Sequence, residues 1–284
     1  MRNFKPFSLN IHGNLVEFTE PQVMGILNVT PDSFYASSRH LDADSIAKQA
    51  IGMLDNGVDI IDIGAYSSRP GAQEVCIDEE LRRLKLGIET IRKNVSSDIL
   101  ISVDTFRSEV ARIAVEEYGA DIINDISGGT LDSEMFVTVK NLKVPYILMH
   151  MRGTPASMQT MTDYLDVTAD VITDIAKKIS ILNDIGVNDI IVDPGFGFAK
   201  TVPQNFRLLH HLDLIGQATG QPLLVGVSRK SMIYKSLDIT PEKALNGTTI
   251  INTIALLQGA SILRVHDVKE AREAVNLVNL TINS

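Results

Sequence analysis

A short pattern recurs four times along this chain and constrains its fold more than any other feature. Each copy has a glycine followed closely by an apolar run that ends in two aliphatic side chains. The copies begin at Gly57, Gly119, Gly186 and Gly259, at intervals of roughly 60 to 75 residues, and such self-similarity indicates repeated supersecondary units. A glycine in this place is typical of the end of a helix, and the run after it is typical of a buried strand.

One further apolar run lies between successive copies of the pattern, at 99–104, 145–149 and 222–227. A first strand at 23–28 brings the predicted number to eight, and helices are expected between them, such as 42–56, 78–93, 163–184 and 241–258. Strict alternation of strands and helices predicts a parallel sheet. Eight such units predict an α/β fold with a single closed (β/α)8 TIM barrel, and the alternative is an open doubly wound sheet.

The chain is predicted to contain one main domain. A length of 284 residues could hold two domains, but one α/β barrel also fits it, and no shift in composition marks a second unit. Residues 1–21 are expected to be a lead-in of short strand or irregular structure. Residues 22–284 are expected to form the barrel.

The overall charge limits the classes of partner. A net charge of -9 argues against nucleic acid or an acidic membrane surface as a main partner. The single cysteine, Cys76, excludes an internal disulfide framework and suits a reducing compartment. The first residues have no long apolar core, and no apolar run approaches membrane-spanning length. These features predict a soluble protein of the cytoplasm.

Nearly every predicted strand stops at a polar or charged residue. In barrels of this class the active site is built at the C-terminal ends of the strands. One such residue could be a structural cap, but a ring of them around one mouth predicts a binding site. The strand ends carry Asn28, Asp62, Asp104, Asn124, Asp125, His150, Asp193, Ser228, Arg229, Lys230, Arg264 and His266.

The cations among these residues come late in the chain and predict an anion subsite. Arg229, Lys230, Arg264 and His266 follow the seventh and eighth strands, which is the usual phosphate position in barrels. Arg69, in the loop after the second strand, could reach in to help. Guanidinium groups favour bidentate contacts with phosphate.

The acids and amides of the middle strands predict a second subsite. Asp104, Asn124 and Asp193 would suit a neutral ring that carries several N–H donors. A carboxylate that faces an amino-pyrimidine edge accepts two parallel hydrogen bonds, much as it does from arginine. The glycine-rich loop 195–201, which follows Asp193, has neither the P-loop spacing nor the third glycine of a dinucleotide fingerprint.

These motifs together resemble those of the dihydropteroate synthase family. The match runs in order from about residue 22 to the end of the chain and reaches all eight strands. The strings that carry it are Met24-Gly-Ile-Leu-Asn-Val-Thr-Pro-Asp-Ser-Phe34, Asp62-Ile-Gly64, Ser67-Ser-Arg-Pro-Gly71, Ser102-Val-Asp-Thr105, Ile123-Asn-Asp-Ile-Ser127, Asp193-Pro-Gly-Phe-Gly-Phe198, Ser228-Arg-Lys-Ser231 and Arg264-Val-His-Asp-Val268.

The resemblance implies a transferase of folate biosynthesis that needs Mg2+. It condenses 6-hydroxymethyl-7,8-dihydropterin diphosphate with 4-aminobenzoate and gives 7,8-dihydropteroate and diphosphate. In the family the displacement is similar to an SN1 reaction, with a cation at the exocyclic methylene. The resemblance also implies a homodimer, and a pocket for aminobenzoate that takes sulfonamides as well.

The resemblance further implies a role for each matching residue. Those on the pterin would be Asp104, Asn124, Met149, Asp193 and Lys230. Those on the diphosphate would be Asn28, Ser68, Arg69, Arg264 and His266, with Asn28 also a metal ligand. Those around aminobenzoate would be Pro70, Phe198, Ser228 and Arg229. The group expected to be catalytic is Asp104, Asp193, Lys230, Arg264 and His266.

Two loops depart from the family pattern. The first usually reads Phe-Ser-Asp-Gly-Gly and here is Phe34-Tyr-Ala-Ser-Ser38, which should be stiffer because two glycines are missing. The second usually carries Gly-Glu-Ser-Thr before the arginine and here is Ala65-Tyr-Ser-Ser68. We hypothesise that Tyr35 and Tyr66 make loop contacts specific to this branch, which Tyr35→Phe and Tyr66→Phe would test through the KM for aminobenzoate.

Two other functions fit part of the same evidence. A pterin-binding methyltransferase that acts on a corrinoid protein shares the barrel and the pterin carboxylates, but it would not need the late cations for a diphosphate. A non-catalytic pterin-binding subunit would bind a pterin without releasing diphosphate. Following diphosphate from pterin diphosphate, aminobenzoate and Mg2+ separates all three.

Overall fold

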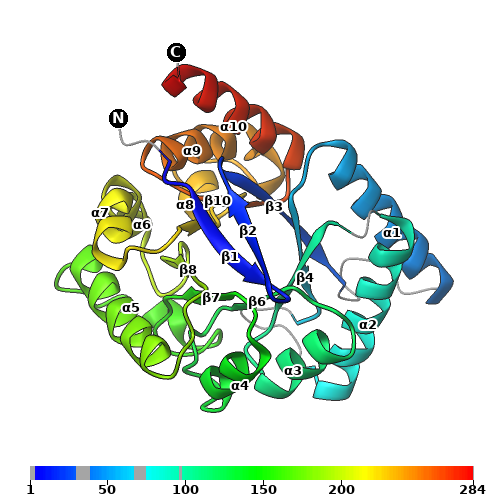
Figure 1. Cartoon of the computed structure of the whole chain (residues 1–284). Coiled ribbons are helices and arrows are strands. Elements are labelled where there is room, and N and C mark those ends of the chain that lie inside the picture. The colour runs from blue at the N-terminus through cyan, green and yellow to red at the C-terminus, as the bar shows by residue number, and fades with distance from the viewer. Residues whose placement is uncertain (1–3, 30–38, 67–74, 96–97, 284) are drawn as a thin grey trace.

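Eight parallel strands form a barrel that is ringed by helices, as the repeat predicts (Figure 1). The computed structural model describes residues 4–29, 39–66, 75–95 and 98–283. The barrel strands are β3 (Gln22–Asn28), β4 (Ile60–Gly64), β5 (Leu100–Asp104), β6 (Ile122–Asp125), β7 (Tyr146–Met149), β8 (Ile190–Asp193), β9 (Leu224–Val225) and β10 (Ile262–Val265). The helices are α1 (Arg39–Asp55), α2 (Ile77–Asn94), α3 (Ser108–Glu116), α4 (Met135–Leu142), α5 (Val167–Asp184), α6 (Val202–His210), α7 (Leu212–Thr219), α8 (Ser231–Tyr234), α9 (Leu245–Leu257) and α10 (Val268–Asn283).

The four repeated glycines follow the ends of α1, α3, α5 and α9. Gly57, Gly119, Gly186 and Gly259 have φ of +82°, +74°, +92° and +93°, in the left-handed region that a residue with a Cβ rarely adopts. Each is followed closely by the next barrel strand. The pattern in the sequence therefore reports a backbone turn, and the prediction of a helix–glycine–strand unit is confirmed.

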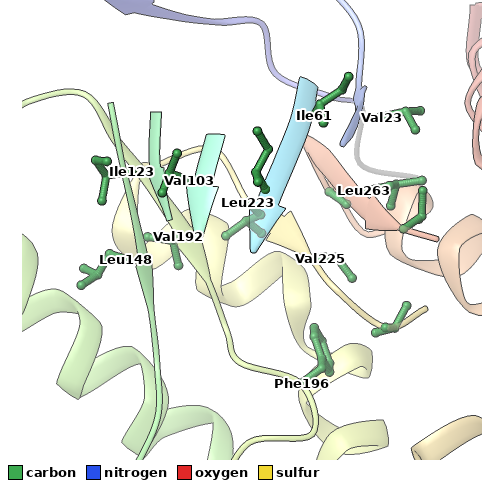
Figure 2. Close-up of a cluster of buried hydrophobic side chains, with 14 of the residues drawn as sticks. Val23, Ile61, Val103, Ile123, Leu148, Val192, Phe196, Leu223, Val225 and Leu263 are labelled. Atoms are coloured by element: carbon green, nitrogen blue, oxygen red, sulfur yellow. The ribbon is translucent and has the colours of Figure 1, made fainter. Parts of the chain in front are cut away.

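Alternate residues of the strands face the helices and form the larger core. Figure 2 shows Val23, Ile61, Val103 and Leu148 among the buried side chains of this cluster, which also takes in Leu84 and Ile88 of α2. Successive side chains of a strand point to opposite faces, so the intervening residues face the barrel interior.

The barrel closes between β8 and β9, at the two ends of the strand order. There the amide of Val192 donates to the carbonyl of Pro222 at 2.9 Å, and Val192 is bridged to Leu223. The seventh predicted strand, 222–227, is shorter than expected, because only Leu224 and Val225 form a ladder. Pro222 has no N–H to give to a ladder, and Gly226 is a weak strand former.

A β-hairpin covers the end of the barrel where the strands begin (Figure 1). Its strands β1 (Phe7–Ile11) and β2 (Asn14–Phe18) bury Leu9, Ile11 and Phe18 against the lower interior side chains. Those side chains are Met24, Ile60, Ile122, Ile147, Ile191, Leu224 and Ile262, and they form an apolar floor. The lead-in is thus a hairpin packed on the barrel.

Two polar contacts fasten the hairpin to loops at the start of barrel strands. The amide of Asn10 donates to Oδ1 of Asp189 at 2.8 Å, and Nε2 of His12 lies 2.8 Å from Oδ1 of Asp121. Among the described residues, no helix combines the length and apolar character needed to cross a membrane. The cytoplasmic location stays a prediction.

Truncating the hairpin's buried side chain tests whether the floor stabilises the fold. Leu9, only 2% exposed, packs on the floor, so Leu9→Ala should lower the free energy of unfolding by about 2–4 kcal/mol. Leu15 on the neighbouring strand is 71% exposed, so Leu15→Ala should stay within about 0.5 kcal/mol. Urea denaturation of both variants measures the difference. Equal effects would show that the hairpin is not part of the cooperative core.

Candidate active site

A polar layer lies directly above the apolar floor, inside the barrel. It follows from the two-residue period of the strands, because each floor residue is followed two positions later by the next interior residue. Ile60 is followed by Asp62, and Ile191 by Asp193. Ile122 and Ile262 are likewise followed by Asn124 and Arg264.

Arg264 on β10 bridges two carboxylates of this layer. Its Nε lies 2.6 Å from Oδ2 of Asp62, and its Nη2 lies 2.8 Å from Oδ2 of Asp104. The amide nitrogen of Asn124 donates to the same Asp62 oxygen at 3.1 Å. We call Asp62, Asp104, Asn124 and Arg264 the arginine-centred array. It joins one cation of the predicted anion subsite directly to the predicted ring subsite.

Burial sets the charge states of the arginine-centred array. Burial raises the pKa of Asp104 to about 7, although the guanidinium of Arg264 opposes this. Burial also disfavours the charged form of Arg264, but Asp62 and Asp104 outweigh it and hold the pKa of Arg264 above its usual value. Asp62 is fully buried, and its Oδ1 has no hydrogen-bond partner among the described residues. The array keeps its arginine charged and leaves Asp104 able to respond to a ligand.

Asp193 and Lys230 form the neighbouring part of the layer. Oδ1 of Asp193 accepts from the amide of Gly195 at 2.7 Å, and the Lys230 ammonium donates to the carbonyl of Phe196. Burial raises the pKa of Asp193, against the influence of Lys230. Burial lowers the pKa of Lys230 to about 8, and Asp193 opposes it. Each group favours the charged form of the other.

Apolar side chains line the mouth beside these charges. Met149 belongs to a buried cluster against which Phe198 and Phe106 pack. The Phe198 ring centre lies 4.5 Å from Nζ of Lys230, within the range of a cation–π contact. A flat heterocycle can therefore meet polar atoms at its edge and apolar side chains at its faces.

His266 and Asn28 line a shared open cavity of about 440 Å3. Nδ1 of His266 lies 3.0 Å from Oγ of Ser228, and the His266 amide donates to the same oxygen at 3.2 Å. These contacts orient the imidazole. The rest of the lining comes from β3, from α1 and Asn56 just after it, and from Val268 at the start of α10.

The comparisons with known proteins agree with this geometry. The model of a protein family described as "Pterin binding enzyme" matches residues 24–266. A dihydropteroate synthase of Synechocystis is 45% identical over 250 residues, which are 87% of this chain and 85% of that protein.

Two solved structures align over nearly the whole chain. The dihydropteroate synthase of Yersinia pestis in a sulfonamide drug complex has a TM-score of 0.89 and 38% identity, and covers 98% of this chain and 100% of its own. The Xanthomonas albilineans dihydropteroate synthase with 4-aminobenzoic acid has a TM-score of 0.88 and 35% identity, over 98% of each chain. The chain belongs to the dihydropteroate synthase family.

Arg229 pairs with Asp267, outside the arginine-centred array. Its guanidinium forms a bidentate pair with Asp267, with Nη2 to Oδ1 at 2.6 Å and Nε to Oδ2 at 2.9 Å. Asp267 thereby raises the pKa of Arg229. The predicted contact of Arg229 with aminobenzoate would require this pair to open or to share a donor. That role stays a prediction.

Several residues matched to the family cannot be placed. Ser68, Arg69 and Pro70, and the loop Phe34-Tyr-Ala-Ser-Ser38, lie outside the described residues. Tyr66 is described, and its ring packs edge-on to Phe106 with centres 5.2 Å apart and lies 5.3 Å from the Arg107 guanidinium carbon. Tyr66 thus contacts the loop after β5, and its effect on aminobenzoate stays a hypothesis.

Two buried residues of the site, Asp62 and Lys200, are assigned to neither subsite by the sequence. Asp62 was recognised as a strand end, but its role in holding Arg264 depends on a partner 202 residues away. Lys200 was set aside with the glycine-rich loop, yet it is only 5% exposed and contacts His150 beneath that loop. A lone lysine within a glycine–phenylalanine loop directly after a site carboxylate was the available signal.

The pKa values predict how pterin affinity depends on pH. Asp104 is ionised above about 7, and Lys230 is charged below about 8, so both are charged between these values. A pterin that uses both should bind most tightly in that window and more weakly on either side. Calorimetric titration across pH measures this. Asp104→Asn should lose the acidic limb and keep the alkaline one, and an unchanged acidic limb would refute the assignment.

Proposed function

We propose that this protein condenses 6-hydroxymethyl-7,8-dihydropterin diphosphate with 4-aminobenzoate and releases diphosphate. The observation that carries the proposal is the arginine-centred array, which lies beside Asp193 and Lys230 above a closed floor. It offers acceptors for a ring rich in N–H groups and a fixed cation for an anionic leaving group. The family membership and the two ligand-bound relatives support the same reaction.

The pterin would lie edge-on to the polar layer. Its amino group and ring N–H groups would donate to carboxylates of the layer, chiefly Asp193 and Asp104, while the Lys230 ammonium and the amide of Asn124 would meet its acceptor atoms. Met149 and Phe198 would cover its faces, since Met149 belongs to the buried cluster beside the charges and Phe198 packs against that cluster. The ring's donors would satisfy carboxylates that burial makes costly to charge.

The diphosphate would extend toward the cations of the last two βα units. Asp62 and Asp104 accept from Nε and Nη2 of Arg264. A guanidinium has five N–H donors, so the remaining N–H groups of Arg264 can donate to phosphate oxygens. His266 would add a donor from the cavity that it shares with Asn28. Ser68 and Arg69, which lie outside the described residues, would complete the set by family analogy.

The residues present fit a Mg2+ ion held mainly by the substrate. Such an ion keeps several waters and takes only one or two protein oxygens besides the phosphates. Asn28 at the end of β3 supplies one amide oxygen to the cavity. In the described ranges, no three acidic, cysteine or histidine side chains gather as metal ligands. Bound there, the metal would neutralise charge on the diphosphate.

The reaction breaks the bond between the exocyclic methylene carbon and the diphosphate oxygen and forms a bond from that carbon to the aminobenzoate nitrogen. The bonding electron pair leaves with the diphosphate, and the amine gives up one proton. Arg264 and His266 would stabilise the departing charge, and the carboxylates below would stabilise the cationic methylene. The amine is already nucleophilic when it is held in place, so no strong general base is required.

Aminobenzoate would enter at the mouth, above the pterin. Phe198 and Ser228 are described there, and Pro70 and Arg229 would join them by family analogy. A ring that lies on Phe198 would also cover the reacting carbon. Excluding water matters because water would otherwise consume the cation.

Release of diphosphate tests the proposal. Wild-type protein mixed with pterin diphosphate, aminobenzoate and Mg2+ should release diphosphate in step with dihydropteroate. Lys230→Ala and Asp193→Asn should each reduce kcat/KM by a factor that corresponds to about 2–4 kcal/mol, since each removes a buried charged contact.

Lys269→Ala is the matched control for these variants. Its amine is exposed on α10 and pairs only weakly with Glu273 at 3.9 Å, so turnover should be unchanged. Near-normal turnover in Lys230→Ala or Asp193→Asn would remove that residue from the site. Pterin binding without diphosphate release would favour the non-catalytic subunit, and methyl transfer to a corrinoid protein would favour the methyltransferase.

We also propose a homodimer formed through α9 and α10. These neighbouring helices carry exposed aliphatic side chains, with Leu277 65% and Leu280 70% exposed on α10 and Ile250 51% and Ile254 38% exposed on α9. A second copy would remove this apolar surface from water. The family resemblance supports the same state.

Sedimentation velocity tests the dimer. Leu277→Glu together with Leu280→Glu should shift the protein toward monomer, because burying unpaired carboxylates is costly. Leu165→Glu, at a fully exposed position before α5, should leave the sedimentation coefficient unchanged. A monomeric wild-type protein, or a double variant that stays dimeric, would argue against this interface.

A further inference from the structure

The buried amine of Lys200 is fully occupied by three partners. It donates to the carbonyls of Gly195 at 2.9 Å and Phe198 at 3.1 Å, and it lies 3.0 Å from Nδ1 of His150. An ammonium has three N–H donors, so the three partners satisfy it completely. Both carbonyls belong to the turn at 195–198, which directly follows Asp193 and Pro194.

These three contacts of Lys200 are compatible with either protonation state of its amine. Burial lowers the pKa of His150 to about 2, so the imidazole is neutral and its Nδ1 can accept a hydrogen bond from an ammonium. Burial also lowers the pKa of Lys200 to about 7; Asp193 and Asp174 oppose this change, while Lys230 and Arg152 add to it. A neutral amine would still donate to both carbonyls and could accept from the other tautomer of His150. The turn therefore stays held near neutral pH.

The turn needs such support, because its backbone is unusual. Gly195, Gly197 and Ala199 have φ of +72°, +81° and +50°, and the last of these carries a Cβ in the left-handed region. A Cβ at Gly195 would lie 2.0 Å from the carbonyl oxygen of His150, so only glycine fits there. A strained conformation persists only where its surroundings determine it.

The same turn presents two features to the active site. The carbonyl of Phe196 accepts from the Lys230 ammonium, and the ring of Phe198 lies 4.5 Å from that nitrogen. Asn205 of α6 adds a second anchor, accepting from the amide of Gly197 at 2.7 Å. Lys200 and Lys230 thus donate to carbonyls of one turn, the first beneath the loop and the second in the site.

We propose that Lys200 is a positioning residue for the aminobenzoate half of the reaction. By fixing the carbonyls of Gly195 and Phe198, it places the Phe198 ring over the mouth and the Phe196 carbonyl at Lys230. This rests on the proposed function. The turn also meets the pterin half, at Asp193 and Lys230. The other polar residues of that half, Asp104, Asn124 and Arg264, lie on β5, β6 and β10, so the pterin half should be affected less than the aminobenzoate half.

Lys200→Met tests this inference, because it keeps an unbranched side chain only one atom shorter and removes every donor. With both substrates varied in the diphosphate assay, the KM for aminobenzoate should rise about tenfold or more, and the KM for pterin diphosphate by less than about threefold. Lys178→Met is the matched control. Lys178 is also buried, but its ammonium pairs with Asp174 on α5, so both KM values should stay unchanged.

His150→Leu keeps the test decisive if Lys200→Met does not fold. It removes one of the three partners, and the KM for aminobenzoate should rise in the same selective way by a smaller factor. Equal changes in both KM values, or none, in the soluble variant would reduce Lys200 to a structural role. If the wild-type protein is active in the diphosphate assay, that result would leave the proposed function intact. An inactive wild-type protein would overturn both the proposed function and the role of Lys200.

Discussion

A charged side chain inside a closed barrel is stable only when opposite charges or hydrogen bonds meet it, and the centre of this protein is arranged around that requirement. Arg264 meets Asp62 and Asp104 at 2.6 and 2.8 Å. Asp193 and Lys230 each favour the other's charged form. The apolar floor supplies no polar partner, so the partners of these charges come from the layer itself and from the backbone of the loop after β8.

The balance of charge in that layer differs from that of the whole chain. The chain carries a net charge of -9, whereas the acids Asp62, Asp104 and Asp193 of the layer face the cations Arg264 and Lys230. A neutral heterocycle is suited to such a layer. Arg264 contacts two of the acids, so a diphosphate that met its remaining donors would couple the two halves of the proposed substrate. Ring donors can satisfy the acids while phosphate oxygens engage the arginine.

Much of the fold could be predicted, because the decisive signals are local. The repeated glycines mark left-handed residues at helix ends, and the alternation within strands determines which side chains face inward. The short β9 was not predicted, because a run of apolar residues does not reveal how many of its amides find a partner. Nor was the role of the hairpin, because sealing the barrel depends on contacts between distant segments.

The site was predicted less completely, for the same reason. In the sequence, the acids follow the middle strands and the cations follow the last two, which suggests two separate subsites. Closure of the barrel, however, makes β10 the neighbour of β3 and so brings the last strand beside the first. Arg264 therefore reaches acids that precede it by 202 and 160 residues. Lys200 was not predicted because two of its three partners are backbone carbonyls, which a sequence does not reveal.

The hairpin of β1 and β2 has one more consequence. Leu9, Ile11 and Phe18 pack beneath the strands and close that end of the barrel. A ligand bound to the polar layer would therefore enter from the opposite end of the barrel, where the strands finish. The hairpin lies far from any reacting atom, yet it would thus set the side from which substrates enter and products leave.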